Sequence, residues 1–306
     1  MKDDQNKDFE EKQKSLKELE DIISKTNFSD IKDINNTVAK AYDIYKKFPD
    51  SEEVASQYVE TLDSLAETQD SLADIKSTVA KAYGVYERFS DSEEVAYFYV
   101  STLNTLLGRL ESSDDIELTV AKAYGVYERF SDSEEVASQY VKTLDSLVET
   151  QDSLADVEST VAKACGVYER FSDSEAVAYF YVSTLNTLLG RLESSDDIKL
   201  TVAKAYGVYE RFSDSEEVAS QYVKTLDSLV ETQDSLADVE STVAKAYGVY
   251  ERFSDSEAVA FRYVSTLDTL ASSQKNLADI KSTVAKAYGV YERFSDSEAV
   301  AFRYVS

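Results

Sequence analysis

An exact internal repeat is the feature that most limits how this chain can fold. The motif Thr-Val-Ala-Lys-Ala-Tyr, or a near relative, begins at positions separated by 41 residues with no insertion: Thr37, Thr78, Thr119, Thr160, Thr201, Thr242 and Thr283. A gap-free period near 40 is typical of a solenoid, because every repeat must dock on the next in the same way. The repeat therefore predicts a stacked array, whereas a length of 306 residues alone would suggest about two globular domains.

Each repeat contains the pattern of two amphipathic helices. In residues 153–171 apolar side chains recur every three or four positions, and Ser153 with Asp156 forms a capping-box-like start. Residues 215–233 show the same spacing, with Asp214 as the expected N-cap. The links are tight turns of about two to four residues, so consecutive helices should run antiparallel. We therefore expect an all-α solenoid, a right-handed superhelix of antiparallel helical hairpins.

The two ends of the chain differ from the internal repeats. Residues 1–36 match the motif poorly, but Leu16 and Leu19 belong to one apolar stripe on an otherwise charged helix. A helix with one docking face suits a solenoid cap, so we assign 1–36 to a capping region and 37–306 to the tandem array. The last repeat, 283–306, holds 24 of its 41 residues. We expect end-to-end self-association through this uncapped C-terminal repeat.

Charge and residue counts exclude several classes of function. The chain has 32 Lys plus Arg against 59 Asp plus Glu, a formal charge of −27, which opposes binding to nucleic acid or an anionic membrane. It has no His and one Cys, so a Ser-His-Asp or Cys-His nucleophile and a zinc site are excluded. We therefore expect no catalytic residue, no metal and no cofactor, and predict that the chain is not an enzyme.

The sequence also indicates a compartment. No apolar run approaches the roughly 18 residues of a membrane span, and the first residues lack the apolar region of a signal peptide. Because Cys165 is the only cysteine, a reducing cytoplasm is the expected location.

Parts of every repeat resemble the tetratricopeptide repeat. One helix has the spacing of a small residue and a Tyr, the other has a small residue followed by two aromatic residues, and a proline turn joins repeats. These features are carried by Ala219, Tyr222, Ala205, Tyr209, Phe212, Pro49 and Asp50. The period of 41 residues is nearer to HEAT and armadillo repeats, the second resemblance. What the tetratricopeptide resemblance implies is a superhelical scaffold that binds peptides or protein surfaces in its groove.

Tyrosines recur at three positions of most repeats, for example Tyr124, Tyr127 and Tyr140. At about 100° for each residue of a helix, all three fall inside the apolar arcs of their helices. We expect them to form ladders of rings in the core. Cys165 replaces one ladder tyrosine, and we expect a tolerated core residue there instead of a reactive thiol.

A second period of 82 residues alters the start of the second helix in alternate repeats. Ser138-Gln139 and its equivalents give way to an aromatic pair, and the last two repeats carry Phe-Arg. Both positions lie about 130° from the centre of the apolar arc, where a solenoid helix touches its neighbour or lines the groove. The aromatic pair either packs between repeats or forms an aromatic strip that binds a partner. The candidate partner-binding residues are Tyr97, Phe98, Tyr179, Phe180, Phe261 and Phe302.

A glycine also recurs in the middle of the first helix, at Gly84, Gly125, Gly166, Gly207, Gly248 and Gly289. A helical glycine costs about 1 kcal/mol relative to alanine. These glycines either permit a bend or the close approach of another backbone, or they were inherited when the repeat was duplicated.

The expected function is a protein–protein interaction scaffold that binds a peptide or protein in a groove lined mainly by the second helices. The charge of −27 favours a basic partner. The alternative is a structural or spacer array without a dedicated ligand.

Overall fold

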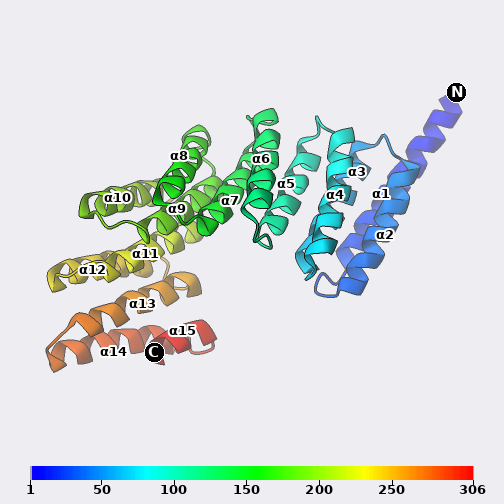
Figure 1. Cartoon of the computed structure of the whole chain (residues 1–306). Coiled ribbons are helices and arrows are strands. Elements are labelled where there is room, and N and C mark those ends of the chain that lie inside the picture. Colours follow the sequence, from blue (N-terminus) through cyan, green and yellow to red (C-terminus); the bar gives the residue numbers. More distant parts are fainter. Residues whose placement is uncertain (1, 306) are drawn as a thin grey trace. The chain divides into compact units, whose positions relative to one another are not determined.

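The computed structural model describes the backbone of residues 2–305 and the side chains of residues 9–301. Within that part the chain forms α-helices joined by short turns, with no strand (Figure 1). It divides into two compact units, an N-terminal lobe (Met1–Leu147) and a C-terminal lobe (Val148–Ser306). Each lobe is built from consecutive helical hairpins, which confirms the predicted all-α helical-repeat fold.

The helices follow the repeat boundaries closely. The first helices of the repeats are α2 (Ile31–Lys47), α4 (Leu72–Arg88), α6 (Ser113–Arg129), α8 (Leu154–Arg170), α10 (Ser195–Arg211), α12 (Leu236–Arg252) and α14 (Leu277–Arg293). The second helices are α3 (Glu52–Thr68), α5 (Glu93–Leu107), α7 (Glu134–Thr150), α9 (Glu175–Leu189), α11 (Glu216–Glu231), α13 (Glu257–Ser273) and α15 (Glu298–Val305). Helix α1 (Lys2–Lys25) precedes the repeats.

Polar caps set where the helices begin. The expected N-cap positions of the first helices are confirmed at Asp30, Ser71, Ser112, Ser153, Ser194, Ser235 and Asn276, of which Ser112, Ser153 and Ser235 make no side-chain capping hydrogen bond. The second helices correct our prediction, because the cap of α11 is Ser215 and not Asp214. The Ser215 hydroxyl accepts a hydrogen bond from the Val218 amide at 3.1 Å, which leaves the Asp214 carboxylate available for an ion pair.

Such carboxylates join five of the first helices (α4, α6, α10, α12 and α14) to the preceding repeat. Arg129 Nη2, at the end of α6, lies 2.6 Å from Oδ1 of Asp91 in the turn before α5. Equivalent pairs at 2.5–2.6 Å are Arg88–Asp50, Arg211–Asp173, Arg252–Asp214 and Arg293–Asp255. The aspartates are 90–95% exposed, so solvent screens these pairs and their main effect is on register, not stability.

Second helices of neighbouring repeats pack directly on one another, whereas first helices do not. In the N-terminal lobe α3 contacts α5, and in the C-terminal lobe α11 contacts both α9 and α13. Among the described residues, no Cα atom of α2 lies within 8 Å of α4, and none of α10 lies within 8 Å of α12. The second helices therefore form the inner layer of each lobe, and the first helices stand apart on its surface.

Burial follows from this arrangement. Helix α11 buries a broad face of Val218, Ala219, Tyr222, Val223, Thr225, Leu226, Asp227 and Val230. Helix α10 buries only the narrow stripe of Ile198, Thr201, Ala205 and Val208. In α1, Leu16 and Leu19 are buried, and α1 packs against α2 and α3. One helix of each hairpin thus supplies most of the core, and the other covers it from one side.

The mid-helix glycines provide a test of stability. A Cβ atom built at Gly207 or Gly248 would meet nothing within 4 Å, so alanine fits both sites. We expect each Gly→Ala substitution to stabilise the chain by about 1 kcal/mol, because alanine loses less backbone entropy in a helix. Thermal denaturation followed by circular dichroism measures this. The converse change at the exposed Ala203→Gly, on the same helix as Gly207, should destabilise by a similar amount. A lower Tm for the Gly207→Ala or Gly248→Ala variant than for the parent chain would mean that these positions need glycine for a bend.

Candidate functional site

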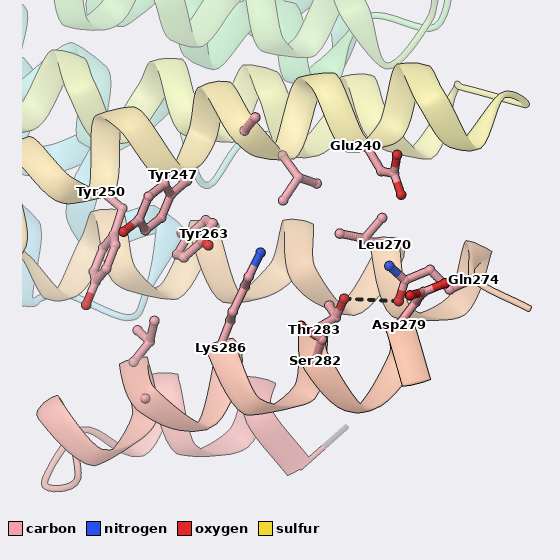
Figure 2. A pocket seen from close by; sticks show the side chains of 14 residues that line it. Glu240, Tyr247, Tyr250, Tyr263, Leu270, Gln274, Asp279, Ser282, Thr283 and Lys286 are labelled. Carbon is pink, nitrogen blue, oxygen red and sulfur yellow. Dashed lines mark hydrogen bonds between the residues drawn. The ribbon is translucent and has the colours of Figure 1, made fainter. Parts of the chain in front are cut away.

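The most defined groove of the C-terminal lobe lies between two first helices, with a second helix beneath them. It has a volume of about 650 Å³. Helix α12 contributes Tyr247 and Tyr250 to one wall, α13 contributes Tyr263 to the floor, and α14 contributes Lys286 and Gly289 to the other wall. Figure 2 shows the three tyrosines gathered at one end, with Lys286 extending from α14 into the groove beside them.

The far end of this groove is polar. The Thr283 hydroxyl donates a hydrogen bond to Gln274 Oε1 at 3.0 Å, which ties α14 to the loop after α13. Figure 2 places Asp279 beside this pair and Glu240 across from it on α12. The groove therefore has an aromatic end, a central ammonium group and a polar end that carries the carboxylates.

The same groove recurs one repeat earlier, between α10 and α12 over α11. Its volume is about 1150 Å³, and each of its key residues lies 41 positions before its equivalent in the first groove. Those residues are Tyr206, Tyr209, Tyr222, Lys245 and Gly248. Helix α12 therefore lines two grooves, with Tyr247 on one side and Lys245 with Gly248 on the other. We call these two sites, and their equivalents in other repeats, the first-helix grooves.

The N-terminal lobe places the same residue types together. The ring of Tyr99 on α5 lies 5.1 Å from Tyr86 and 5.6 Å from Tyr83, both on α4, measured between centroids. Lys122 on α6 stands over the Tyr83 ring, with Nζ 6.0 Å from its centroid. This is a cation–π contact between successive first helices, and it shows that the lysine and the rim tyrosine face each other across the gap.

Burial of the tyrosine ladders differs from our expectation at one of three positions. Tyr140 is 3% exposed and Tyr127 is half-buried, as the helical wheel predicts. The row of Tyr124 was expected in the core and is instead 40–44% exposed at Tyr42, Tyr83, Tyr124, Tyr206, Tyr247 and Tyr288. The prediction was wrong because no first helix packs against this edge: among the described residues, no Cα atom of α10 lies within 8 Å of α12. Cys165 occupies the same row and is half-buried at its edge, not in the core.

The exposed tyrosines are held by their own helices. The Tyr124 hydroxyl donates to Glu128 Oε1 at 2.5 Å, and Tyr206 and Tyr247 make the same contact with Glu210 and Glu251. This carboxylate is the main reason that the pKa of the Tyr124 phenol is raised. The rings of these three tyrosines are therefore fixed, because their hydroxyls are bonded to the next turn of the same helix.

The predicted aromatic pairs lie on the second helices, and none of their residues lines either of the two first-helix grooves described above. Tyr97 and Phe98 are half-buried and pack edge to face with centroids 5.1 Å apart. Tyr179 and Phe180 repeat this contact at 5.0 Å. Half-buried Phe261 instead lies against the guanidinium of Arg262, 5.2 Å from the ring centroid, and the Phe302 side chain lies outside the described residues. In the C-terminal lobe α11 separates α9 from α13, so Phe180 and Phe261 are not brought together.

The position of Phe98 has a packing role in alternate repeats. Its equivalent Gln139, on α7, accepts hydrogen bonds from Asn104 Nδ2 of α5 at its backbone oxygen (3.1 Å) and its Oε1 (3.0 Å). The Thr143 hydroxyl donates to Asn104 Oδ1 at 2.6 Å. Asn186, Gln221 and Thr225 repeat this network in the C-terminal lobe. Gln139 and Gln221 therefore lie in the interface between second helices, and both of our interpretations of Phe98 itself, packing between repeats and partner contact, stay predictions.

The sequence carries a signal for this interface that we missed. Asn104 and Asn186 precede a Gln by 35 residues, whereas Asp63 precedes Phe98 by the same interval. The alternation of aromatic and Ser-Gln pairs thus accompanies an alternation of Asp and Asn one repeat earlier.

Phe98 offers no amide, and Oδ1 of Asp63 is buried without a hydrogen-bond partner. Burial is the main reason that the pKa of Asp63 rises to about 7. Ser101 and Lys142 lower this pKa, and Glu67 and Glu60 raise it.

Asp63→Asn should therefore change the pH dependence of stability. Because the folded pKa lies near 7 and the ordinary value is 3.8, the folded state binds more protons, and stability falls as pH rises through this range. We expect the variant to match the parent near pH 3.5 and to be more stable near pH 8, by at most about 4 kcal/mol. Urea denaturation across this pH range measures the difference.

Asn104→Asp is the matched control for that prediction, since it places the carboxylate where the chain has an amide. It should lose stability near pH 8, where the buried group ionises. An Asp63→Asn variant less stable than the parent near pH 8 would show that the ionised carboxylate contributes to folding.

No known protein-family model matches the chain, and neither does any curated protein. The class of protein is therefore defined by its structure, in which hairpins of one repeated sequence pack side by side as a helical solenoid. Among the described residues, none of the helices combines the length and apolar character needed to cross a bilayer. Nor does any group of three or more His, Cys, Asp or Glu side chains in that part of the chain form a metal site.

Proposed function

We propose that this chain is a protein-interaction scaffold whose first-helix grooves bind segments of a partner polypeptide. The observation that carries the proposal is the recurrence of one open groove, with the same tyrosines, lysine and glycine, at successive repeats. Peptide recognition by stacked hairpins is also what the resemblance to tetratricopeptide repeats implies.

The chemistry of the grooves supports a polypeptide ligand. Tyrosines such as Tyr206 and Tyr247 present a large apolar ring and a polar edge to solvent, and such rings are enriched at protein interfaces. Gly248 and Gly289 leave open space over the opposite wall, where a partner backbone can approach closely. A series of similar shallow sites gains affinity when one ligand occupies several of them.

The site that we propose differs from the one that the sequence suggested. A groove lined mainly by second helices was expected, but the grooves above have walls of first helices, and second helices form only their floor. The half-buried pairs at Tyr97 and Tyr179 remain a second candidate surface on the other layer. Acidic residues at the start of each second helix, such as Glu93 and Glu94, favour a basic partner there.

Panning a library of short random peptides on the purified chain tests the proposal and distinguishes the two surfaces. Peptides that bind saturably are titrated against a groove variant, Tyr206→Ser with Tyr247→Ser, and against a second-helix variant, Tyr179→Ser with Phe180→Gln. The second variant installs the Ser-Gln pair that alternate repeats already carry. We expect the groove variant to weaken binding by about tenfold or more, as loss of buried aromatic anchors does, and the second-helix variant to bind normally.

Two results would contradict this proposal. Loss of binding only in the second-helix variant would assign the function to the aromatic pairs. The absence of any saturable peptide would favour the structural or spacer alternative, in which function depends on the number of repeats. Circular dichroism of both variants verifies that the helices are retained.

A further inference from the structure

We propose that the polar end of the groove between α12 and α14 binds a basic side chain of the partner, arginine in particular, between Glu240 and Asp279. The inference rests on the proposed function and adds the chemical class of its ligand. The net charge of the chain already suggested a basic partner, and the groove assigns the cation of that partner to one pair of residues.

Two carboxylates stand on opposite walls of this groove. Glu240 belongs to α12 and Asp279 to α14, and both line the cavity of about 650 Å³. Figure 2 shows them at the end away from the tyrosines, whereas Lys286 extends beside the tyrosines. The lining thus contains two carboxylates and one ammonium group. Two negative charges that face each other across a groove repel, and a cation bound between them is attracted by both.

An equivalent pair of first helices in the N-terminal lobe shows a cation in contact with this aspartate position. Four repeats before Glu240 and Asp279 the chain has Lys76 on α4 and Asp115 on α6. Lys76 Nζ lies 2.8 Å from Asp115 Oδ2, so an ammonium group on one first helix reaches the carboxylate of the next. Where the first wall carries lysine, the chain itself supplies the cation. Where it carries Glu240, both walls are acidic and a ligand can supply the cation instead.

One variable position of the repeat distinguishes these two cases. The aspartate recurs without change, at Asp33, Asp74, Asp115, Asp156, Asp197, Asp238 and Asp279. The other position is lysine in Lys76, Lys199 and Lys281 and glutamate in Glu117, Glu158 and Glu240. The groove between α10 and α12 therefore has Lys199 where its neighbour has Glu240. This exchange of one residue reverses the charge on one wall, so the two grooves form a natural pair for comparison.

A guanidinium group suits two carboxylates on separate walls. Its five N–H donors form a planar fork that can bond to more than one carboxylate, whereas a lysine ammonium is a compact point charge. Lys286 repels a cation from the aromatic end of the groove and so favours its position at the carboxylates. The partner residues next to the arginine then lie toward Tyr247 and Tyr263, where apolar or aromatic side chains are favoured.

The site does not have the ligands of a metal centre. Among the described residues, no group of three or more His, Cys, Asp or Glu side chains could hold a metal ion. Both carboxylates are exposed, so each contributes a modest, salt-sensitive attraction, and the arginine needs the aromatic wall beside it for affinity. A short peptide with arginine between aromatic residues is therefore the expected ligand.

The test compares two variants of equal charge. The groove-position variant replaces glutamate by glutamine wherever this position has it: Glu117→Gln, Glu158→Gln and Glu240→Gln. The control makes the same change at three exposed glutamates that start second helices: Glu134→Gln, Glu175→Gln and Glu216→Gln. The probes are capped peptides Leu-Tyr-Xaa-Tyr-Leu, in which Xaa is arginine, its neutral analogue citrulline, or glutamate. NMR titration at physiological ionic strength gives the Kd of each peptide, and thermal denaturation shows whether the variants fold.

We expect the parent chain to bind the arginine peptide about threefold or more tightly than the citrulline peptide, and the glutamate peptide most weakly. The preference for arginine over citrulline should disappear in the groove-position variant and persist in the control, because a general attraction to the charge of the chain affects both variants equally. Lys199→Glu should strengthen binding of the arginine peptide, since it gives the groove between α10 and α12 a second acidic wall opposite Asp238.

Four results would overturn the inference. They are an equal change of this preference in both glutamine variants, tighter binding of the citrulline or glutamate peptide, no measurable binding of the arginine peptide, and no effect of Lys199→Glu. In each case the library peptides and the Tyr206 and Tyr247 variant still decide separately whether the grooves bind polypeptide. Failure of this inference can therefore be distinguished from failure of the proposed function.

Discussion

Direct packing of second helices on one another is the interaction on which the remaining structure depends. Their faces of Val, Ala, Tyr and Leu are almost completely buried, as in α11, and they supply most of the apolar area removed from water. Because these helices occupy the inner layer, the first helices cover them from one side and stand more than 8 Å apart between Cα atoms. The grooves and their exposed tyrosines follow from that separation.

Polar groups within this packed layer explain why the repeats alternate. Asn104 bonds to Gln139 and Thr143 of the next repeat, so a buried amide has its donors and its acceptor satisfied. Asp63 meets a repeat that carries Phe98 in place of the glutamine, and its buried oxygen lacks a partner. The period of 82 residues thus describes two kinds of interface between second helices. A partner contact by the aromatic pairs would come in addition to this packing role.

Repetition also shapes the proposed activity. Because the copies are nearly identical, the two described grooves offer the same tyrosines, lysine and glycine, and we propose that one long flexible ligand binds both. The surplus of acidic residues includes helix starts such as Glu216 and Glu217, where negative charge interacts favourably with the helix dipole. The linings of the two described grooves contain both carboxylates and lysines beside the tyrosines.

The sequence by itself determined the helices, the hairpins and their stacking, since period, apolar spacing and cap residues such as Ser71 and Ser153 are local signals. It also indicated that Tyr140 is buried, because that residue lies at the centre of an apolar face. Only the tertiary structure decided whether a residue at the edge of an apolar helix face is exposed or contacts a neighbouring helix. Tyr124 and Gln139 lie at similar edges, yet Tyr124 is exposed to solvent and Gln139 bonds to a neighbouring helix. Helical periodicity defines which face is apolar, but the distance to the next helix depends on which of the two layers packs closely, and no local pattern encodes that distance.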